Sequence, residues 1–183
     1  MKPVERSEIV DFQTYNDGRD QSRPAALAAK ALRRVVVSEN FTFLFENRET
    51  VRYQVQEMMR AERIVREADI EHELKTYNEL LGGEGELGCT LLVTIDSEQE
   101  RDVKLRAWLD LNRRLYAKLS DGSLVRPTFD PRQVGDERLS SVQYLKFPVG
   151  PQAPVAIGVE GDAAAECVLD DEQRGALQAD LDA

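Results

Sequence analysis

The side chains best suited to chemistry are predicted to share one face of a helix between residues 48 and 67. At about 100° per residue, six polar residues of this segment project within about 100° of one another. They are Glu49, Arg52, Tyr53, Gln56, Arg60 and Arg63. Carboxylate, phenol, amide and guanidinium groups on one face can hydrogen-bond a ligand or a partner protein, and the planar guanidinium fork suits anions.

This polar face has two interpretations. A run of charged residues usually faces water, where pairs such as Glu49 with Arg52 or Tyr53 contribute only tenths of a kcal/mol. The alternative is a small-molecule site or an enzyme pocket in which carboxylate and guanidinium groups share acid–base and anion-binding duties. Four side chains would wall that pocket: Glu49, Tyr53, Gln56 and Arg60.

The opposite face of the same helix is apolar and is expected to face the core. It carries Val51, Val55, Met58, Met59 and Val65. Glu62 falls inside this arc, and a buried carboxylate needs a partner or a raised pKa. Arg66, one turn later, can supply an ion pair, so Glu62 is expected to be a paired acid at the edge of the core or a functional acid.

Histidine and cysteine are too scarce for most metal and redox centres. His72 is the only histidine, and the helix from Asp69 onward places it opposite an apolar stripe, where we expect it to be solvated. Asp69 and His72 have the i, i+3 spacing of ferritin-like di-iron sites, which need two such pairs. A site shared by two chains across a dimer axis is therefore the remaining alternative.

Cys89 and Cys167 stand far apart and form no CxxC motif, which excludes an iron–sulfur cluster or a cysteine-rich zinc site within one chain. We expect both to be small buried residues, and a disulfide between them stays open. No metal and no cofactor is predicted.

Composition limits the choice of partner and compartment. The formal net charge of −10 disfavours nucleic acid, whose phosphates such a surface repels. The first residues lack the apolar region of a signal peptide, and no run approaches the roughly 20 apolar residues of a membrane span. The sequence thus predicts a cytoplasmic protein without a membrane partner, and leaves a homo-oligomer open.

Residues 1–183 are expected to form one domain, of α+β class, with a mostly antiparallel sheet and helices packed on one face. Helices are predicted after Ser7, from Ser22 through residues 24–34, from Asn47 to about residue 67, from Asp69 to a glycine cap at Gly82 and Gly83, after Ser97, and after Asp170. Strands are predicted at 35–37 and 41–46, which form a hairpin, and at 88–96. The Asp121-Gly122 pair predicts a hairpin that opens an antiparallel meander.

Several long and unusual motifs carry a family resemblance: ENRETVRYQVQEMMRAERI, TYNELL, GELGCTLL, FDPRQVG and RLSSVQYLKF. With them the chain resembles, over nearly its whole length, the bacterial family known as domain of unknown function 3501. The resemblance implies no established activity and no catalytic residues. It implies genes near rubrerythrin-like di-iron proteins and iron–sulfur oxidoreductases, and hence a role in redox metabolism or oxidative stress.

The resemblance and the scarcity of metal ligands together favour a non-catalytic accessory protein. We expect it to bind a ferritin-like or iron–sulfur partner with a surface near the long helix. A small-molecule-binding protein or enzyme using the pocket defined above is the alternative.

Overall fold

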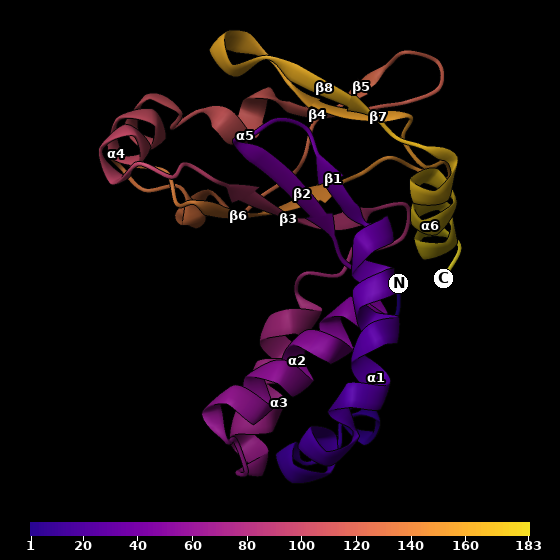
Figure 1. The fold of residues 1–183 in the computed structure, drawn as a ribbon. Helices are drawn as coiled ribbons and strands as arrows, with labels where there is room; N and C mark the ends of the chain where they lie inside the picture. The colour runs from indigo at the N-terminus through magenta and orange to yellow at the C-terminus, as the bar shows by residue number, and fades with distance from the viewer.

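The computed structural model describes residues 1–183 and has two four-stranded antiparallel sheets with a layer of helices below them (Figure 1). This arrangement confirms the predicted α+β class. The helices are α1 (Phe12–Leu32), α2 (Arg48–Glu62), α3 (Glu67–Asn78), α4 (Glu98–Ala107), α5 (Leu111–Arg114) and α6 (Asp171–Leu181). Single 3₁₀ turns occupy Arg6–Glu8, Pro131–Gln133 and Gly161–Ala163.

The first sheet has the order β1-β2-β3-β6 and the second the order β5-β4-β7-β8. The strands of the first are β1 (Arg34–Val36), β2 (Phe41–Phe45), β3 (Leu87–Val93) and β6 (Val142–Phe147). Those of the second are β4 (Leu115–Lys118), β5 (Leu124–Val125), β7 (Ala156–Val159) and β8 (Ala165–Val168). The hairpins β1–β2 and β4–β5 are the two that the sequence predicts.

The prediction of one continuous antiparallel meander after Asp121-Gly122 is wrong from β6 onward. After β5 the chain leaves the second sheet, and β6 pairs with β3 of the first sheet, Leu145 lying opposite Cys89. The reason is burial, because alternate residues of β6 complete the apolar inner face of the first sheet. The strands therefore form a two-sheet sandwich and not one continuous sheet.

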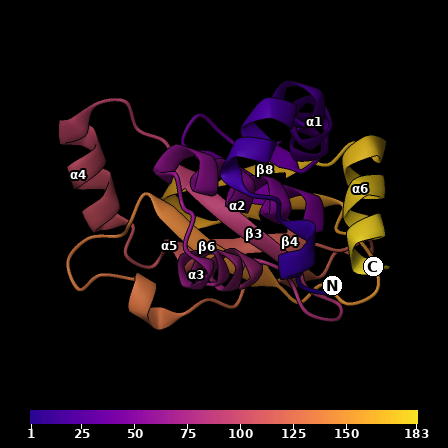
Figure 2. The same cartoon turned by 90° about the horizontal axis from the view of Figure 1, so that it is seen from below.

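The main core fills the space between the two sheets. Alternation places Phe41, Phe43 and Phe45 of β2 on the inner face, and Phe147 of β6 packs against Phe43 and Phe45 with ring centroids 6.4 and 6.2 Å apart. Leu177 of α6 joins the same core. Helices α1, α2 and α3 lie beyond the outer face of the first sheet (Figures 1 and 2).

The first long helix starts earlier than predicted. Asp11, not Ser22, is its N-cap, because the Asp11 carboxylate accepts hydrogen bonds from the backbone N–H groups of Gln13 and Thr14. The helix continues through Pro24, although proline removes one backbone donor there. The residues expected to hold a separate first helix after Ser7 form only the 3₁₀ turn Arg6–Glu8, capped by Glu5.

Helix α2 ends earlier than predicted, and the prediction that Glu62 lies at the edge of the core is therefore wrong. Asn47 is the N-cap as expected, but α2 stops at Glu62 because Arg63 adopts a left-handed conformation with φ 53°. Val65 therefore lies beyond the helix and is 70% exposed, and Glu62 is exposed as well. Arg66 pairs with Asp69 at 2.9 Å and not with Glu62.

A second, smaller core lies between α2, α3 and the N-terminal segment. It comprises Val4, Ile9, Val51, Val55, Met59, Ile70, Leu74 and Leu81. The expected glycine cap of α3 is wrong, since that helix ends at Asn78 and neither Gly82 nor Gly83 has a positive φ. None of the helices is long and apolar enough to cross a membrane.

Candidate functional site

The polar face predicted from the sequence lies against α1 and the segment that precedes it, and only part of it meets water. Helices α1 and α2 pack side by side (Figures 1 and 2). Part of the polar face of α2 therefore lies next to α1. These side chains fall into two groups. Some tie α2 to its neighbours, others line a cavity, and Gln56 does both.

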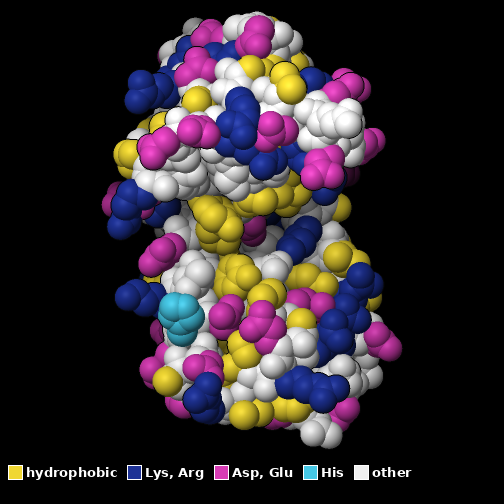
Figure 3. Space-filling model, turned by 90° about the vertical axis from the view of Figure 1, so that its left-hand side faces the viewer, with side chains coloured by type: hydrophobic (Ala, Val, Ile, Leu, Met, Phe, Trp, Pro, Cys, Tyr) yellow, Lys and Arg dark blue, Asp and Glu magenta, His cyan; other side chains and the backbone are white.

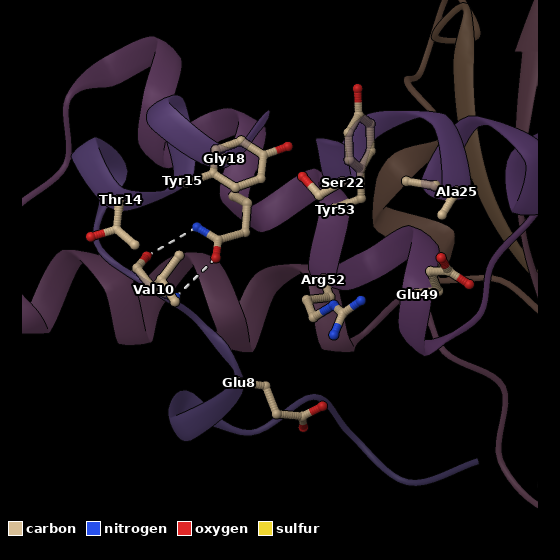
Figure 4. Close-up of a pocket in the computed structure, with 12 residues that line it drawn as sticks. Glu8, Val10, Thr14, Tyr15, Gly18, Ser22, Ala25, Glu49, Arg52 and Tyr53 are labelled. Carbon is tan, nitrogen blue, oxygen red and sulfur yellow. Dashed lines mark hydrogen bonds between the residues drawn. The ribbon is translucent and has the colours of Figure 1, made fainter. Parts of the chain in front are cut away.

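Gln56 belongs to the first group. Its side chain is buried, its Nε2 donates to the carbonyl of Val10 at 3.0 Å, and its Oε1 accepts from the Val10 N–H at 2.9 Å (Figure 4). Both ends of the amide are therefore occupied by the backbone of the segment before α1. Gln56 can shape the cavity wall, but it has no free donor for a ligand.

Arg60 contacts a charged cluster that the polar face of α2 does not predict. At its centre, Glu57 accepts hydrogen bonds from Tyr15 Oη at 2.7 Å and from Arg19 Nε at 2.7 Å, and Arg60 lies 3.5 Å from its second oxygen. The Arg19 hydrogen bonds, with help from Tyr15, lower the pKa of Glu57 to about 2. Burial and the neighbouring Glu57 raise the pKa of Tyr15. This cluster joins α1 to α2 and leaves Arg60 outside the cavity.

The cavity between α1 and α2 has a volume of about 390 Å³ (Figure 4). From the predicted face, Glu49, Arg52, Tyr53 and Gln56 line it. From α1 and the preceding segment come Glu8, Val10, Thr14, Tyr15, Gly18, Ser22, Ala25 and Ala26. Its wall is therefore apolar at Val10, Ala25 and Ala26, and polar or charged along α2.

The charges around this cavity are unevenly paired. Arg48 binds Glu8 at 2.6 Å and, followed by Arg52, contributes to the lowered pKa of Glu8, whose largest cause is a hydrogen bond from the Glu5 backbone. Glu49 and Arg52, by contrast, make no ion pair or side-chain hydrogen bond, either with each other or with the rest of the chain. The cavity thus presents one free carboxylate and one free guanidinium, one helical turn apart.

The remaining predicted residues lie at the far end of α2. Glu62, Arg63, Asp69 and His72 border a separate, shallow hollow of about 410 Å³ where α2 meets α3. Arg63 and His72 are exposed. No three histidine, cysteine, aspartate or glutamate side chains are arranged to hold a metal ion.

The two cysteines are free, with Cys89 buried on β3 and Cys167 partly exposed on β8. Burial raises the pKa of the Cys89 thiol well above its ordinary value. A thiol in that environment stays protonated and is a poor nucleophile.

Comparison with known proteins supports the resemblance seen in the sequence. A family model described as "Protein of unknown function (DUF3501)" matches residues 3–181. A crystal structure from Burkholderia pseudomallei, described as a novel protein of unknown function, is 26% identical and superposes with a TM-score of 0.89. The alignment covers 98% of this chain and 100% of that one. No curated protein matches the chain.

Proposed function

Since the chain belongs to the DUF3501 family, whose description carries no activity, we propose a function from its geometry: the cavity between α1 and α2 binds a small zwitterion such as an amino acid. The observation that carries this proposal is the unpaired state of Glu49 and Arg52 on the cavity wall. Opposite charges three residues apart on a helix can pair with each other, and these two do not.

The two free charges define the ligand. The guanidinium of Arg52 can take a carboxylate through two parallel hydrogen bonds, and the carboxylate of Glu49 can take an ammonium group. Val10, Ala25 and Ala26 offer an apolar wall for a short side chain. A volume of about 390 Å³ falls within the roughly 300–1,000 Å³ typical of small-molecule sites.

We propose binding and not catalysis at this cavity. Tyr15 and Gln56 are already engaged by Glu57 and Val10, and the single histidine lies on α3 away from the cavity. Of the hydroxyl groups on the wall, Thr14 Oγ1 donates to the capping carboxylate of Asp11 at 2.6 Å and Ser22 Oγ donates to the carbonyl of Arg19 at 3.3 Å, so both are already engaged within α1 and its cap. We also place the protein in the cytoplasm, where its two free cysteines would remain reduced.

The test is calorimetric titration with leucine and its two half-ligands, 4-methylpentanoate and isopentylamine. We expect leucine to bind at least about tenfold more tightly than either half-ligand, because each lacks one charged contact. Arg52→Gln and Glu49→Gln should each weaken leucine binding by about the same factor. Arg23→Gln is the matched control, since Arg23 is exposed on α1, has no side-chain partner and lies outside the cavity lining.

Equal affinity of the zwitterion and the half-ligands would contradict the proposal, as would the failure of every amino acid to bind at millimolar concentration. The ferritin-like or iron–sulfur partner expected from the family resemblance stays a separate prediction. Affinity capture from the native host at physiological salt tests it, and repeated recovery of neither class would count against it.

A further inference from the structure

A further groove lies at the waist of the molecule, between α3 and the outer face of β6. Figure 3 shows the molecule constricted there, with hydrophobic side chains on both sides of the hollow. The groove has a volume of about 530 Å³, and none of its lining residues lines the cavity between α1 and α2. It is therefore independent of the site proposed above.

Three aromatic rings line this groove. Tyr77 comes from α3, Leu80 from the turn after it, Phe129 from the loop after β5, and Tyr144 from β6. Tyr144 is 52% exposed, an unusual state for a large ring on a sheet face that other elements cover. Burial is the main cause of the raised pKa of Tyr77, and the nearby Glu73 and Tyr144 add to it.

The loop wall is held against the edge of β6. Thr128 and Lys146 exchange two backbone hydrogen bonds, of 2.7 and 2.9 Å. The side-chain amide of Gln133 donates to the carbonyl of Tyr144 and accepts from its N–H, both at 2.8 Å. Phe129 lies between these two attachments. The groove is thus formed before any ligand arrives, which lowers the entropic cost of binding.

Lys146 supplies the one free cation of the groove. Alternation along β6 places Lys146 on the same outer face as Tyr144, two residues away. Its side chain is half-buried and makes no ion pair and no hydrogen bond. Of the two carboxylates that also line the groove, Asp130 is bound by Arg132 at 2.6 Å, and Glu79 is exposed.

We propose that this groove binds a planar aromatic molecule with a single negative charge. The ring lies among Tyr77, Phe129 and Tyr144, where offset or edge-to-face contacts are favourable. The anionic group meets the ammonium of Lys146. Asp130 is neutralised by Arg132, whereas Glu79 has no ion-pair partner and disfavours further negative charge beside it, so the groove suits a monoanion better than a polyanion.

The probe for this site is 2-naphthoate, compared with the equally planar cation 2-naphthylmethylamine by calorimetric titration. We expect one 2-naphthoate per chain and weaker binding of the amine. Lys146→Met should weaken 2-naphthoate binding by about tenfold, and Lys146→Arg should retain it, because the charge is what counts. Lys104→Met, on α4 and outside the groove, is the control and should bind as the unaltered protein does.

A second measurement locates the probe even if a variant fails to fold. In the unaltered protein, nuclear Overhauser contacts should join the naphthalene protons to the rings of Tyr77 and Tyr144. Arg52→Gln should leave these contacts and the affinity unchanged, which separates this site from the cavity between α1 and α2. Absence of binding at millimolar 2-naphthoate, contacts elsewhere, or equal binding to Lys146→Met would overturn the proposal.

Discussion

The side-chain amide of Gln56 pairs with the backbone of Val10 as a neighbouring strand would, through one donated and one accepted hydrogen bond. Asn78 of α3 does the same at Val4, with bonds of 2.8 and 2.9 Å. Two amides therefore fasten the N-terminal segment across α2 and α3. The segment in turn covers the smaller core, to which it contributes Val4 and Ile9.

Replacing Gln56 with leucine should destabilise the protein by about 1–3 kcal/mol, since it leaves the N–H and C=O of Val10 without partners in a partly buried place. Urea unfolding measures the change. The control is Gln21→Leu on the exposed side of α1, which should change stability by less than about 0.5 kcal/mol. Hydrogen exchange at Val10 should accelerate only in the first variant, and unchanged exchange there would argue against this role of Gln56.

The Glu57 cluster predicts a loss of stability in acid. The folded pKa of Glu57 is about 2 against an ordinary value of 4.5, chiefly because Arg19 binds the carboxylate. A lowered folded pKa stabilises the fold above the unfolded pKa, and this stabilisation is lost as the pH falls from about 4.5 to about 2. We expect it to amount to about 1–2 kcal/mol at pH 7, after allowance for partial exposure.

Glu57→Gln should therefore lower stability at pH 7 and flatten its decline between pH 5 and pH 2. Urea unfolding at a series of pH values measures both effects. Glu62→Gln is the control, because Glu62 lies on the same helix, is exposed and has no ionic partner. If the unaltered protein and Glu57→Gln lost stability in parallel, Glu57 would not be the group responsible.

A buried ion pair joins the C-terminal end of α1 to α6. Arg33, which follows α1, binds Asp180 of α6 through Nε at 2.7 Å and through its second nitrogen at 2.8 Å, and both residues are 7% exposed. Asp180→Ala leaves a buried guanidinium unpaired and should cost about 3–5 kcal/mol. The double variant Arg33→Met, Asp180→Leu should recover much of that loss. Thermal unfolding of the set checks this, and equal stability of the single and double variants would contradict it.

Local signals in the sequence predict much of this fold. The caps Asn47 and Asp170 and the hairpin at Asp121-Gly122 depend on residues within a few positions of one another, and all three are present in the structure. The pairing of β6 with β3 and the Arg33–Asp180 bond depend on residues far apart along the chain. No local pattern contains that information.

The site was predictable to a similar extent. Helical periodicity places Glu49, Arg52 and Tyr53 on one face, and the structure brings them to one cavity. The full length of α1, which covers that face, is not predicted, because a helix that begins after Ser22 has Pro24 in its first turn, whereas α1 has Pro24 in its interior. Glu57 was missed because it lies about 40° beyond the polar arc. Tyr15 and Arg19 lie one turn apart on α1, and two such hydrogen-bond donors on one helix face indicate a carboxylate on the helix that packs against it.

The turn between α3 and β3 depends on two glycines for space and not for a left-handed conformation. A Cβ on Gly88 would lie 1.8 Å from the carbonyl oxygen of Leu80, and one on Gly82 would lie 2.1 Å from that of Glu86. Both contacts are with backbone, which cannot move aside as a flexible side chain could. Gly88→Ala should therefore destabilise the protein by at least about 2 kcal/mol, as overpacking does.

In Gly175→Ala the new methyl group meets nothing within 4 Å, so this helical substitution should stabilise the protein by about 0.5–1 kcal/mol. Urea unfolding of the two variants should thus give changes of opposite sign, and two changes of the same sign would show that the approach of Leu80 to β3 is looser than the structure has it.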